Sequence, residues 1–506
     1  MTSADPPGPA DSTPDGLTPE QRLAAGTRSP NIFIEAGPGT GKTTVSAYRF
    51  ALQRFGAPAR ADTRAVVAVS FTRSATWSLW RRVQRTWGPS ALAWPHRIVT
   101  LDTIVCDLLH DLLEHGLVRW PNGHKSLDVH DSWASFSSTV WSRSAYALRV
   151  NGDRVEIRTG STPQYGARYP PAIVKQRLEE GICTHEDVRA VLEQLLQNDR
   201  CAERARGRLA STMRALIVDE AFDANDLDIA VIEFAIRAGV AVTLVGDPWQ
   251  ALYVFRGARP EAVLDLIELN AVRTLSLTRS FRWKDSAQRT LAERLRAGEP
   301  VTLPLRAGGA APGVDVMLAL QWKRLWEVGD HVLPLAFHAF KGGSEEAAAT
   351  LLLNHLTRNV LGEDATYLRD ALTALAITDL DTPRQLEPGL QDVAELLRQP
   401  GKAALNAAYS RLVQIVGTVS SRTLRPAHHS HTDRLADLAE RVRNPGRLVP
   451  GLTTHQAKGR EWDAVGVCLS PGERQALAGG LSVQVDTHRQ LYVACTRACR
   501  TTTEFI

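Results

Sequence analysis

A glycine-rich turn near the N-terminus carries the residue types most directly suited to chemistry. It follows the apolar residues 32–34, precedes a segment of helical character, and reads Ala36-Gly37-Pro38-Gly39-Thr40-Gly41-Lys42-Thr43-Thr44. Such a turn directs successive backbone N–H groups to one point at the positive end of a helix dipole, where phosphates bind. Lys42 is placed to reach the β- and γ-phosphates of a nucleoside triphosphate, and Thr43 to offer its hydroxyl to Mg²⁺. The usual pattern begins with glycine rather than Ala36, and the alternative is a turn that binds nothing. The preceding strand and the Gly-Lys-Thr run favour a nucleotide site.

A second segment brings two carboxylates to the end of an apolar run. Residues 215–220 read Ala-Leu-Ile-Val-Asp-Glu, which is typical of a buried parallel strand that ends at the carboxyl edge of a sheet. Asp219 suits the Mg²⁺ shell, and Glu220 suits the base that orients and deprotonates an attacking water. An Asp-Glu pair is also common at ordinary strand ends, so its weight depends on the rest of the chain.

A third segment gives the chain a family resemblance. Residues 242–258 read Val-Thr-Leu-Val-Gly-Asp-Pro-Trp-Gln-Ala-Leu-Tyr-Val-Phe-Arg-Gly-Ala and resemble motif III of the superfamily 1 helicases of the UvrD/Rep/PcrA and RecB type. The other motifs follow in that family's order: residues 17–21 resemble the Q motif, 69–75 motif Ia, 100–104 motif Ib, 277–282 motif IV, 452–462 motif V and 489–498 motif VI. The resemblance covers nearly the whole chain after residue 16.

The resemblance implies an ATP site with Mg²⁺ that is assembled from separate domains. Gln21 should then read the adenine edge, Phe281 stack on adenine, and Glu461 contact the nucleotide from the second domain. Gln250 should sense the γ-phosphate and hold the attacking water. Arg282 and Arg497 should reach across a cleft toward the γ-phosphate, where an arginine is worth on the order of 10³–10⁵ in rate. The alternative for either arginine is a solvated surface charge.

The chain departs from the family in motifs II, Ib and IV. Motif II reads Asp219-Glu220-Ala221-Phe222-Asp223, and Phe222 cannot make the hydrogen bonds of the usual glutamine. This replacement affects the coupling between the ATP and DNA sites but leaves the carboxylates in place. Motif Ib lacks the usual His-Ser pair, and Ser280-Phe281 stands where Asn-Tyr is usual in motif IV.

Aromatic and basic residues in the motifs predict a binding site for single-stranded DNA, which is held by stacking within a basic groove. The residues that the resemblance implicates are Phe71, Thr72, Arg73, Thr100, Tyr253, Phe255, Arg256, Thr454 and His455, and Trp249 is a further stacking candidate. For any single aromatic the alternative is core packing. Arginines also cluster at Arg73, Arg81, Arg82 and Arg85, although a charge run is usually a solvated face.

Strand-like runs at residues 32–35, 65–70, 216–219, 242–245 and 274–277 alternate with helical patterns and predict a parallel α/β sheet. A further strand is expected at residues 332–337. With the resemblance, this gives two RecA-like parallel-sheet P-loop cores. The expected parts are a disordered tail at residues 1–16, a first core (1A) at 17–103 plus 209–282, a mostly helical insertion (1B-like) at 104–208, a second core (2A) at 283–361 plus 452–506, and a reduced 2B-like insertion at 362–451. Ser344 is expected to cap a helix of the second core. A short polar piece at 426–431 contains three histidines and is expected to be a surface loop rather than a metal site.

Composition limits the remaining possibilities. The 506 residues carry a net charge of only +4, so a nucleic-acid surface must come from local clustering. The six cysteines show no C-x₂-C pair and are expected to be buried thiols of a reducing cytosol. Neither a signal peptide nor a long apolar span is recognised, so a cytoplasmic protein without a membrane role is expected.

Two functions are consistent with these features. The first is an ATP-dependent single-stranded DNA translocase, and by resemblance a 3′-to-5′ helicase in DNA repair or related metabolism, acting on single-stranded or tailed duplex DNA. The second is a DNA-stimulated ATPase subunit that unwinds little by itself and serves a nuclease, repair or antiphage-defence partner. The compact 2B-like region and the short C-terminus favour the second, and the layout resembles the helicase-like subunit of the Gabija antiphage system. A catalytically inactive DNA binder is disfavoured because Lys42, Glu220, Gln250 and Arg497 are all present.

Overall fold

The computed structural model describes residues 16–56, 62–133, 136, 140–168, 171–306, 313–379, 382–426, 429–444 and 446–506. The tail that the sequence predicts to be disordered therefore lies outside the described residues, except for Gly16. The chain divides into two compact units, Met1–Thr103 with Arg206–Phe281 and Ile104–Ala205 with Arg282–Ile506. Each unit is described by itself.

The first unit is built on a six-stranded sheet in which every neighbouring pair is parallel. Its strands, in spatial order, are β10 (Arg273–Leu277), β1 (Ile32–Ala36), β9 (Ala241–Gly246), β8 (Met213–Asp219), β2 (Ala65–Ser70) and β3 (Arg97–Thr100). The central strands β2, β8 and β9 are almost entirely buried, which explains why they read as continuous apolar runs.

Helices and short turns connect these strands. The helices are α1 (Pro19–Gly26), α2 (Lys42–Phe55), α3 (Arg73–Trp87), α8 (Asp226–Arg237) and α9 (Pro260–Leu269). Single 3₁₀ turns are η2 (Pro89–Leu92), η5 (Ala221–Asp223), η6 (Pro248–Gln250) and η7 (Val254–Arg256). Phe50 of α2 and Leu79 of α3 belong to the same apolar cluster as Val66 and Ile217 of the sheet. This packing fixes both helices relative to the strand ends that carry the motifs.

The insertion contains helices and a long β-hairpin. Its elements are α4 (Leu101–Glu114), η3 (Pro121–Gly123), β4 (Asp128–His130), β5 (Val140–Asn151), β6 (Arg154–Arg168), α5 (Pro171–Glu179), β7 (Ile182–Thr184), α6 (His185–Leu195) and α7 (Asp199–Thr212). Strands β5 and β6 pair antiparallel, and β4 pairs with β7 in parallel. The helices were predicted from the sequence, whereas the hairpin was not.

The second unit contains another six-stranded sheet with only parallel pairs. Its order is β11 (Leu305–Arg306), β16 (Ala498–Phe505), β15 (Trp462–Cys468), β12 (Val316–Ala319), β14 (Val449–Thr453) and β13 (Val332–Pro334). The helices that connect these strands are α10 (Ser286–Arg296), α11 (Trp322–Glu327), α18 (Thr454–Ala457), α19 (Pro471–Gly479) and α20 (Asp486–Cys495). The two sheets confirm two RecA-like α/β domains.

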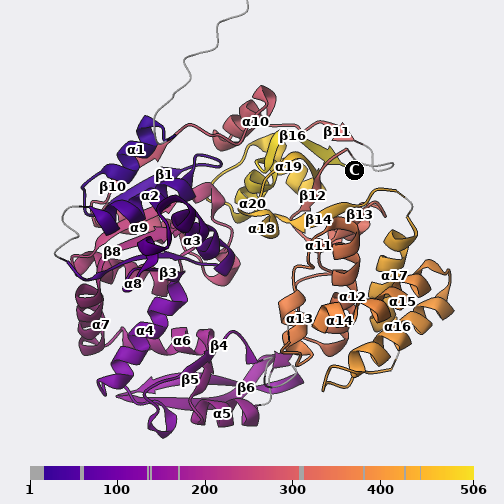
Figure 1. The fold of residues 1–506 in the computed structure, drawn as a ribbon, viewed down its shortest axis with the longest axis horizontal. Coiled ribbons are helices and arrows are strands. Elements are labelled where there is room, and N and C mark those ends of the chain that lie inside the picture. The colour runs from indigo at the N-terminus through magenta and orange to yellow at the C-terminus, as the bar shows by residue number, and fades with distance from the viewer. Residues whose placement is uncertain are drawn as a thin grey trace, which may run out of the picture. The chain divides into compact units, whose positions relative to one another are not determined.

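The remaining part of the second unit is helical. Its helices are α12 (Ser344–Leu361), α13 (Leu368–Ala374), α14 (Thr382–Gln385), α15 (Glu387–Arg398), α16 (Lys402–Gly417) and α17 (His429–Arg443). Figure 1 shows α15, α16 and α17 side by side, and their buried residues join those of α12 in one apolar cluster. The expected 2B-like region is thus a small helical layer that shares a core with α12.

Three local expectations were wrong in detail. Gly343, not Ser344, occupies the N-cap of α12, and Ser344 is the first helical residue. The polar piece at 426–431 is not wholly a loop, because α17 already begins at His429, whereas residues 427 and 428 lie outside the described part. Cys106 is partly exposed rather than buried. Among the described residues, no helix is long and apolar enough to cross a membrane.

Candidate nucleotide site and DNA interface

The predicted phosphate-binding loop connects β1 to α2 in the first unit. Gly39 and Gly41 have φ values of +72° and +86°, a region that side chains other than glycine rarely adopt. A Cβ on Gly41 would lie 2.6 Å from Gln21 Nε2. The loop is braced internally by Thr40, whose hydroxyl donates to the Gly37 carbonyl at 2.9 Å. The glycines are therefore needed for the shape of the loop as well as for the approach of a phosphate.

Gln21 lies directly against this loop. Its side-chain amide donates to the Thr40 carbonyl at 2.9 Å, and its Oε1 accepts from the Thr18 backbone N–H at 3.0 Å. The Thr18 hydroxyl in turn accepts from the Gln21 N–H, which completes a capping box at the start of α1. The structure thus gives Gln21 a role in holding the loop, and its contact with adenine stays a prediction.

Lys42 and Glu220 face each other where α2 begins and β8 ends. Lys42 Nζ lies 3.8 Å from Glu220 Oε1. The ammonium group is buried and makes no hydrogen bond to any described residue, so a triphosphate oxygen would satisfy it. Glu220 adopts φ +57° and ψ +43°, an uncommon conformation for this residue type that clusters at functional sites.

Asp219 precedes Glu220 on β8 and is buried. Together with Thr43 on the first turn of α2, it would hold Mg²⁺, because carboxylate and hydroxyl oxygens are ligands that this ion prefers. When bound, Mg²⁺ supplies positive charge to the β- and γ-phosphates.

Gln250 is fixed by a neighbouring carboxylate that the sequence analysis did not single out. Gln250 Nε2 donates to Asp247 Oδ2 at 2.8 Å, and the Trp249 N–H donates to Asp247 Oδ1 at 3.2 Å. Both Asp247 and Gln250 are buried. Trp249 is also buried, so it packs in the core and does not present a ring to DNA.

Phe222 takes the place of a polar residue in motif II and packs as an apolar plug. Its ring lies edge-on to Phe33, with ring centroids 5.7 Å apart. A Cβ on Gly246 would come within 2.8 Å of Phe222 Cδ2. Phe222 therefore ties the turn after Glu220 to β1 and β9 by packing, where a glutamine would use hydrogen bonds.

The segment before Phe281 is hydrogen-bonded to the phosphate-binding loop. The Phe281 N–H donates to the Gly39 carbonyl at 2.9 Å, and the Ser280 hydroxyl donates to the Pro38 carbonyl at 2.8 Å. The Phe281 ring is 52% exposed, with the Arg279 guanidinium 5.1 Å from its centroid. An exposed ring anchored beside a phosphate loop is suited to stacking on a base.

A contact that the sequence analysis missed anchors the same segment to α1. Glu20 accepts hydrogen bonds from the Thr278 hydroxyl at 2.6 Å and from the Thr278 N–H at 2.8 Å. These bonds, the side-chain bond first, lower the pKa of Glu20. The pattern Thr-Pro-Glu-Gln gives no signal for this contact, because the partner lies 258 residues away.

The second unit brings together three predicted residues from motifs IV, V and VI. Arg282 Nε donates to Glu461 Oε2 at 3.1 Å, and Arg282 Nη1 donates to the Thr496 carbonyl at 3.1 Å. Arg497 follows Thr496, is fully buried, and is linked to β15 by the Trp462 N–H, which donates to the Arg497 carbonyl. The site residues thus form two groups, one in each unit.

The predicted stacking residues of motif III lie on the turn η7. Phe255 is 64% exposed, and its ring centroid lies 6.0 Å from that of Tyr253. The Arg256 guanidinium lies 5.3 Å from the Tyr253 ring and 5.5 Å from the Phe255 ring. This gives an exposed ring, Phe255, beside a partly exposed one, Tyr253, with a cation over both, a combination that binds nucleic-acid bases without sequence preference.

The other predicted DNA contacts divide into accessible and buried residues. Phe71, Thr72 and Thr100 lie at the carboxyl ends of the adjacent strands β2 and β3, and Arg73 is exposed at the start of α3. In the second unit, His455 is partly exposed. Thr454 is fully buried, and its hydroxyl donates to the Ala319 carbonyl at 3.5 Å, so its contact with DNA stays a prediction that the packing does not favour.

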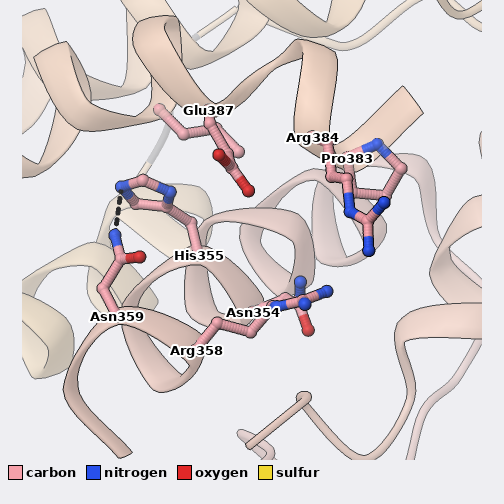
Figure 2. Close-up of a pocket in the computed structure, with 8 residues that line it drawn as sticks. Asn354, His355, Arg358, Asn359, Pro383, Arg384 and Glu387 are labelled. Atoms are coloured by element: carbon pink, nitrogen blue, oxygen red, sulfur yellow. Dashed lines mark hydrogen bonds between the residues drawn. The ribbon is translucent and has the colours of Figure 1, made fainter. Parts of the chain in front are cut away.

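A separate polar pocket lies in the helical part of the second unit (Figure 2). Asn354, His355 and Arg358 of α12 line it together with Glu387 of α15. His355 Nε2 lies 3.1 Å from Asn359 Nδ2 and 3.2 Å from Gln391 Oε1. None of the predicted site residues lines this pocket.

The chain has recognisable relatives. A family model described as an AAA domain matches residues 21–256. The ATP-dependent DNA helicase Rep of Escherichia coli (strain K12) is 25% identical over 294 residues, which cover 53% of this chain and 41% of Rep. The chain therefore aligns with less than half of that relative.

Two solved structures are also similar. The Pif1 helicase from Candida albicans has a TM-score of 0.26 at 14% identity, covering 58% of this chain and 51% of that chain. Unliganded Pif1 from Bacteroides sp has a TM-score of 0.28 at 14% identity, covering 60% and 53%.

The first unit, with its phosphate-binding loop and strand-end carboxylates, has the layout of a P-loop nucleotide-binding domain. The AAA match over residues 21–256, the similarity to Rep and the ordered set of motifs support a relationship to the superfamily 1 helicases.

Proposed function

We propose that this protein is an ATP-dependent single-stranded DNA translocase of the UvrD/Rep type, with 3′-to-5′ polarity and a role in DNA repair or related metabolism. The observation that carries the proposal is the buried, hydrogen-bond-free ammonium of Lys42 facing Glu220 across the phosphate-binding loop. A buried cation beside a carboxylate at a helix N-terminus is suited to binding a triphosphate and to activating water.

Each residue has a defined task in the proposed reaction. Glu220 accepts a proton from the attacking water, and Gln250, held by Asp247, orients that water. Lys42 neutralises charge on the phosphates, and Arg282 and Arg497 of the second unit supply further positive charge as the bond to the leaving group breaks. Turnover in this proposal needs residues from both units.

Tyr253, Phe255 and Arg256 support the DNA part of the proposal, because the exposed Phe255 ring lies beside Tyr253 with an arginine over both, an arrangement suited to stacking on bases. DNA can raise the ATPase rate only by binding the active conformation more tightly than the inactive one. We therefore expect slow hydrolysis without DNA and faster hydrolysis with single-stranded DNA. A rate that no nucleic acid changes would contradict the translocase proposal.

Polarity is tested by strand displacement on duplexes that carry either a 3′ or a 5′ single-stranded tail. We expect displacement from the 3′-tailed substrate only. Displacement from the 5′-tailed substrate alone would leave the ATPase and translocase assignments intact and reverse the polarity.

A second candidate function is a DNA-stimulated ATPase subunit with little unwinding of its own, which serves a nuclease, repair or defence partner. It is favoured by helices α13, α15, α16 and α17, whose buried apolar residues belong to one cluster with α12 and which form only a small layer. We expect the isolated chain to remove a protein block from single-stranded DNA but to open long duplexes poorly. Efficient opening of a long duplex by the isolated chain would exclude this second function.

We also propose a cytoplasmic location. None of the six cysteines forms a disulfide and five of them are buried, which is the usual state of cysteines in a reducing compartment.

A further inference from the structure

Helix α3 has one apolar face and one strongly basic face. Leu79 and Val83 are buried against the sheet of the first unit. The helix contains four arginines and no acidic residue in the sequence RSATWSLWRRVQRTW. Its basic charge is therefore not neutralised by carboxylates on the same helix.

An exposed tryptophan interrupts this basic face. Trp77 is 54% exposed, and the Arg81 guanidinium lies only 4.0 Å from its ring centroid. Arg85 is exposed one turn further along. Because positions four residues apart lie on nearly the same side of a helix, Trp77, Arg81 and Arg85 form one continuous stripe, which we call the α3 stripe.

The α3 stripe begins beside predicted DNA contacts. Thr72 is the N-cap of α3, with its hydroxyl accepting from the Ala75 N–H, and Phe71 precedes it. At ~1.5 Å of rise per residue, the stripe covers about 12 Å between Trp77 and Arg85. It leads away from the carboxyl end of β2, where the motif Ia residues lie.

We propose that the α3 stripe is an additional binding site for single-stranded DNA, beyond the contacts made by the helicase motifs. Trp77 stacks on a base, and Arg81 and Arg85 bind flanking phosphates. The proposal rests on the proposed function, because it extends the path of the same strand. The observations that carry it are charge complementarity and the presence of an exposed aromatic ring within the charged stripe, which together define a site for single strands.

The length of the DNA provides the first test. We would measure binding by fluorescence anisotropy with two oligo-thymidines, one long enough only for the motif Ia and III residues and one roughly twice as long. Trp77→Ala should weaken binding of the longer strand about fivefold or more, as expected for loss of one stacked base. Binding of the shorter strand should stay within twofold of wild type. An equal loss for both lengths, or no loss for either, would overturn the proposal.

The salt dependence of DNA binding separates the role of Trp77 from that of Arg81 and Arg85. The double variant Arg81→Ala with Arg85→Ala should lower the slope of log K against log salt for the longer strand by about 0.7 for each phosphate contact removed. Trp77→Ala should weaken binding without changing this slope. Unchanged slopes in the double variant would show that the arginines do not bind phosphates.

Two matched controls lie on the same unit. Arg82→Ala removes an exposed arginine that is about 100° around the helix from Arg81. Trp94→Ala removes another tryptophan, 85% exposed, outside the stripe. Both should bind the longer strand like wild type, and thermal unfolding checks that every variant is folded.

Binding of oligo-thymidine by the wild type distinguishes a failure of this inference from a failure of the proposed function. If wild type does not bind either oligo-thymidine, the proposed function itself is wrong. If wild type binds and the Trp77 and arginine variants bind equally well, DNA occupies the motif residues only. In that case a different partner, such as an acidic protein surface, must explain the stripe.

Discussion

Arg282 and Glu461 are joined by a hydrogen bond of 3.1 Å between the guanidinium Nε and the carboxylate Oε2, although 179 residues separate them in the chain. The Arg282 side chain is almost completely buried, whereas Glu461 is more than half exposed. Arg282 also donates to the carbonyl of Thr496, the residue before Arg497. Motifs IV, V and VI therefore meet at one guanidinium, which is held in a single orientation by two partners.

The first prediction is that Glu461 acts on catalysis through Arg282. Arg282→Ala should lower the DNA-stimulated rate of ATP hydrolysis by at least about 10³, as for other arginines that stabilise a transferring phosphoryl group. Glu461→Gln should have a smaller effect, because it loosens the arginine without removing it. The double variant should be no slower than Arg282→Ala, since residues that act as a unit are not additive.

Asp463 provides the control for this cycle. It is another carboxylate on β15, and it pairs with Lys284 and Arg500 at the surface. Asp463→Asn should leave the hydrolysis rate near that of wild type. If the effects of Arg282→Ala and Glu461→Gln multiply instead, Glu461 contacts the nucleotide independently of Arg282.

The second prediction concerns Glu220 as the general base of ATP hydrolysis. Glu220→Gln should lower turnover by at least about 10² while ATP binding stays nearly intact, because the amide keeps the size of the side chain but cannot accept a proton. Lys42→Ala should weaken ATP binding as well. Equilibrium binding of a fluorescent ATP analogue and steady-state hydrolysis with single-stranded DNA separate the two effects. Wild-type turnover in Glu220→Gln would show that another group activates the water.

The central strands of both sheets could be predicted closely from the sequence. Buried parallel strands are apolar on both faces, so β2, observed at Ala65–Ser70, has the predicted bounds. The bounds of strands at the edge of a sheet were less predictable. A strand was expected over residues 332–337, but β13 ends at Pro334, although the Leu335 N–H still donates to the Gly451 carbonyl of β14 at 3.0 Å.

The hairpin of the insertion could have been found from a local signal. Gly152 and Asp153 form the two-residue loop between β5 and β6, with Gly152 at φ +61°. A Gly-Asp pair between two extended runs is a hairpin signal. The flanking residues 154–158 read Arg-Val-Glu-Ile-Arg and alternate between polar and apolar residues, as a strand does. The prediction of a mostly helical insertion did not use this signal.

The motifs identified most groups that could do chemistry but not the groups that hold them in place. Asp247, which fixes Gln250, and Glu20, which anchors Thr278, emerged only from the structure. Such supporting contacts depend on which segments the fold brings together, and no spacing in the sequence encodes them.

The third prediction tests the packing of Phe222 of motif II against Gly246. Gly246→Ala should destabilise the protein by about 1–3 kcal/mol, because the new Cβ would lie 2.8 Å from Phe222 Cδ2. In a Phe222→Leu background the same substitution should cost less, since the shorter side chain leaves room. Thermal unfolding of the four proteins in the cycle measures this coupling.

Gly207 offers a matched control, because a Cβ there would meet nothing within 4 Å and its φ is not positive. Gly207→Ala, within helix α7, should be neutral or slightly stabilising. If Gly246→Ala destabilises the wild type and the Phe222→Leu variant equally, the contact between the new Cβ and the Phe222 ring is not the cause of the destabilisation.

The fourth prediction concerns Phe255, the exposed aromatic residue of motif III. Phe255→Ala should weaken binding of single-stranded DNA by ~1–3 kcal/mol, because a stacking surface is removed. Phe255→Trp should bind at least as well as wild type. Val254→Ala, at the neighbouring exposed position, is the control and should bind normally. A lower melting temperature of Phe255→Ala with unchanged DNA affinity would mean that the ring packs within the protein instead.

The fifth prediction is a pH dependence of stability that arises from His96 in the first unit. The ring is buried, and its Nδ1 accepts a hydrogen bond from the Val66 N–H at 2.9 Å. Burial, aided by the charges of Arg54 and Arg214, lowers the pKa of His96 from 6.5 to about 4. Between these two values the unfolded chain binds a proton that the folded chain does not, so His96 makes the protein less stable as the pH falls from 6.5 to 4. The contribution is constant above and below this window.

Replacing His96 with asparagine should flatten this dependence, because the amide oxygen can accept the Val66 N–H without titrating. We expect the melting temperature of His96→Asn to be near or below that of wild type at pH 7 but to fall less between pH 6.5 and 4, the interval set by the two pKa values. His130→Asn, which removes a partly exposed histidine, is the control and should follow the wild-type curve. Parallel curves for His96→Asn and wild type over the whole interval would show that the imidazole is not held neutral by the fold.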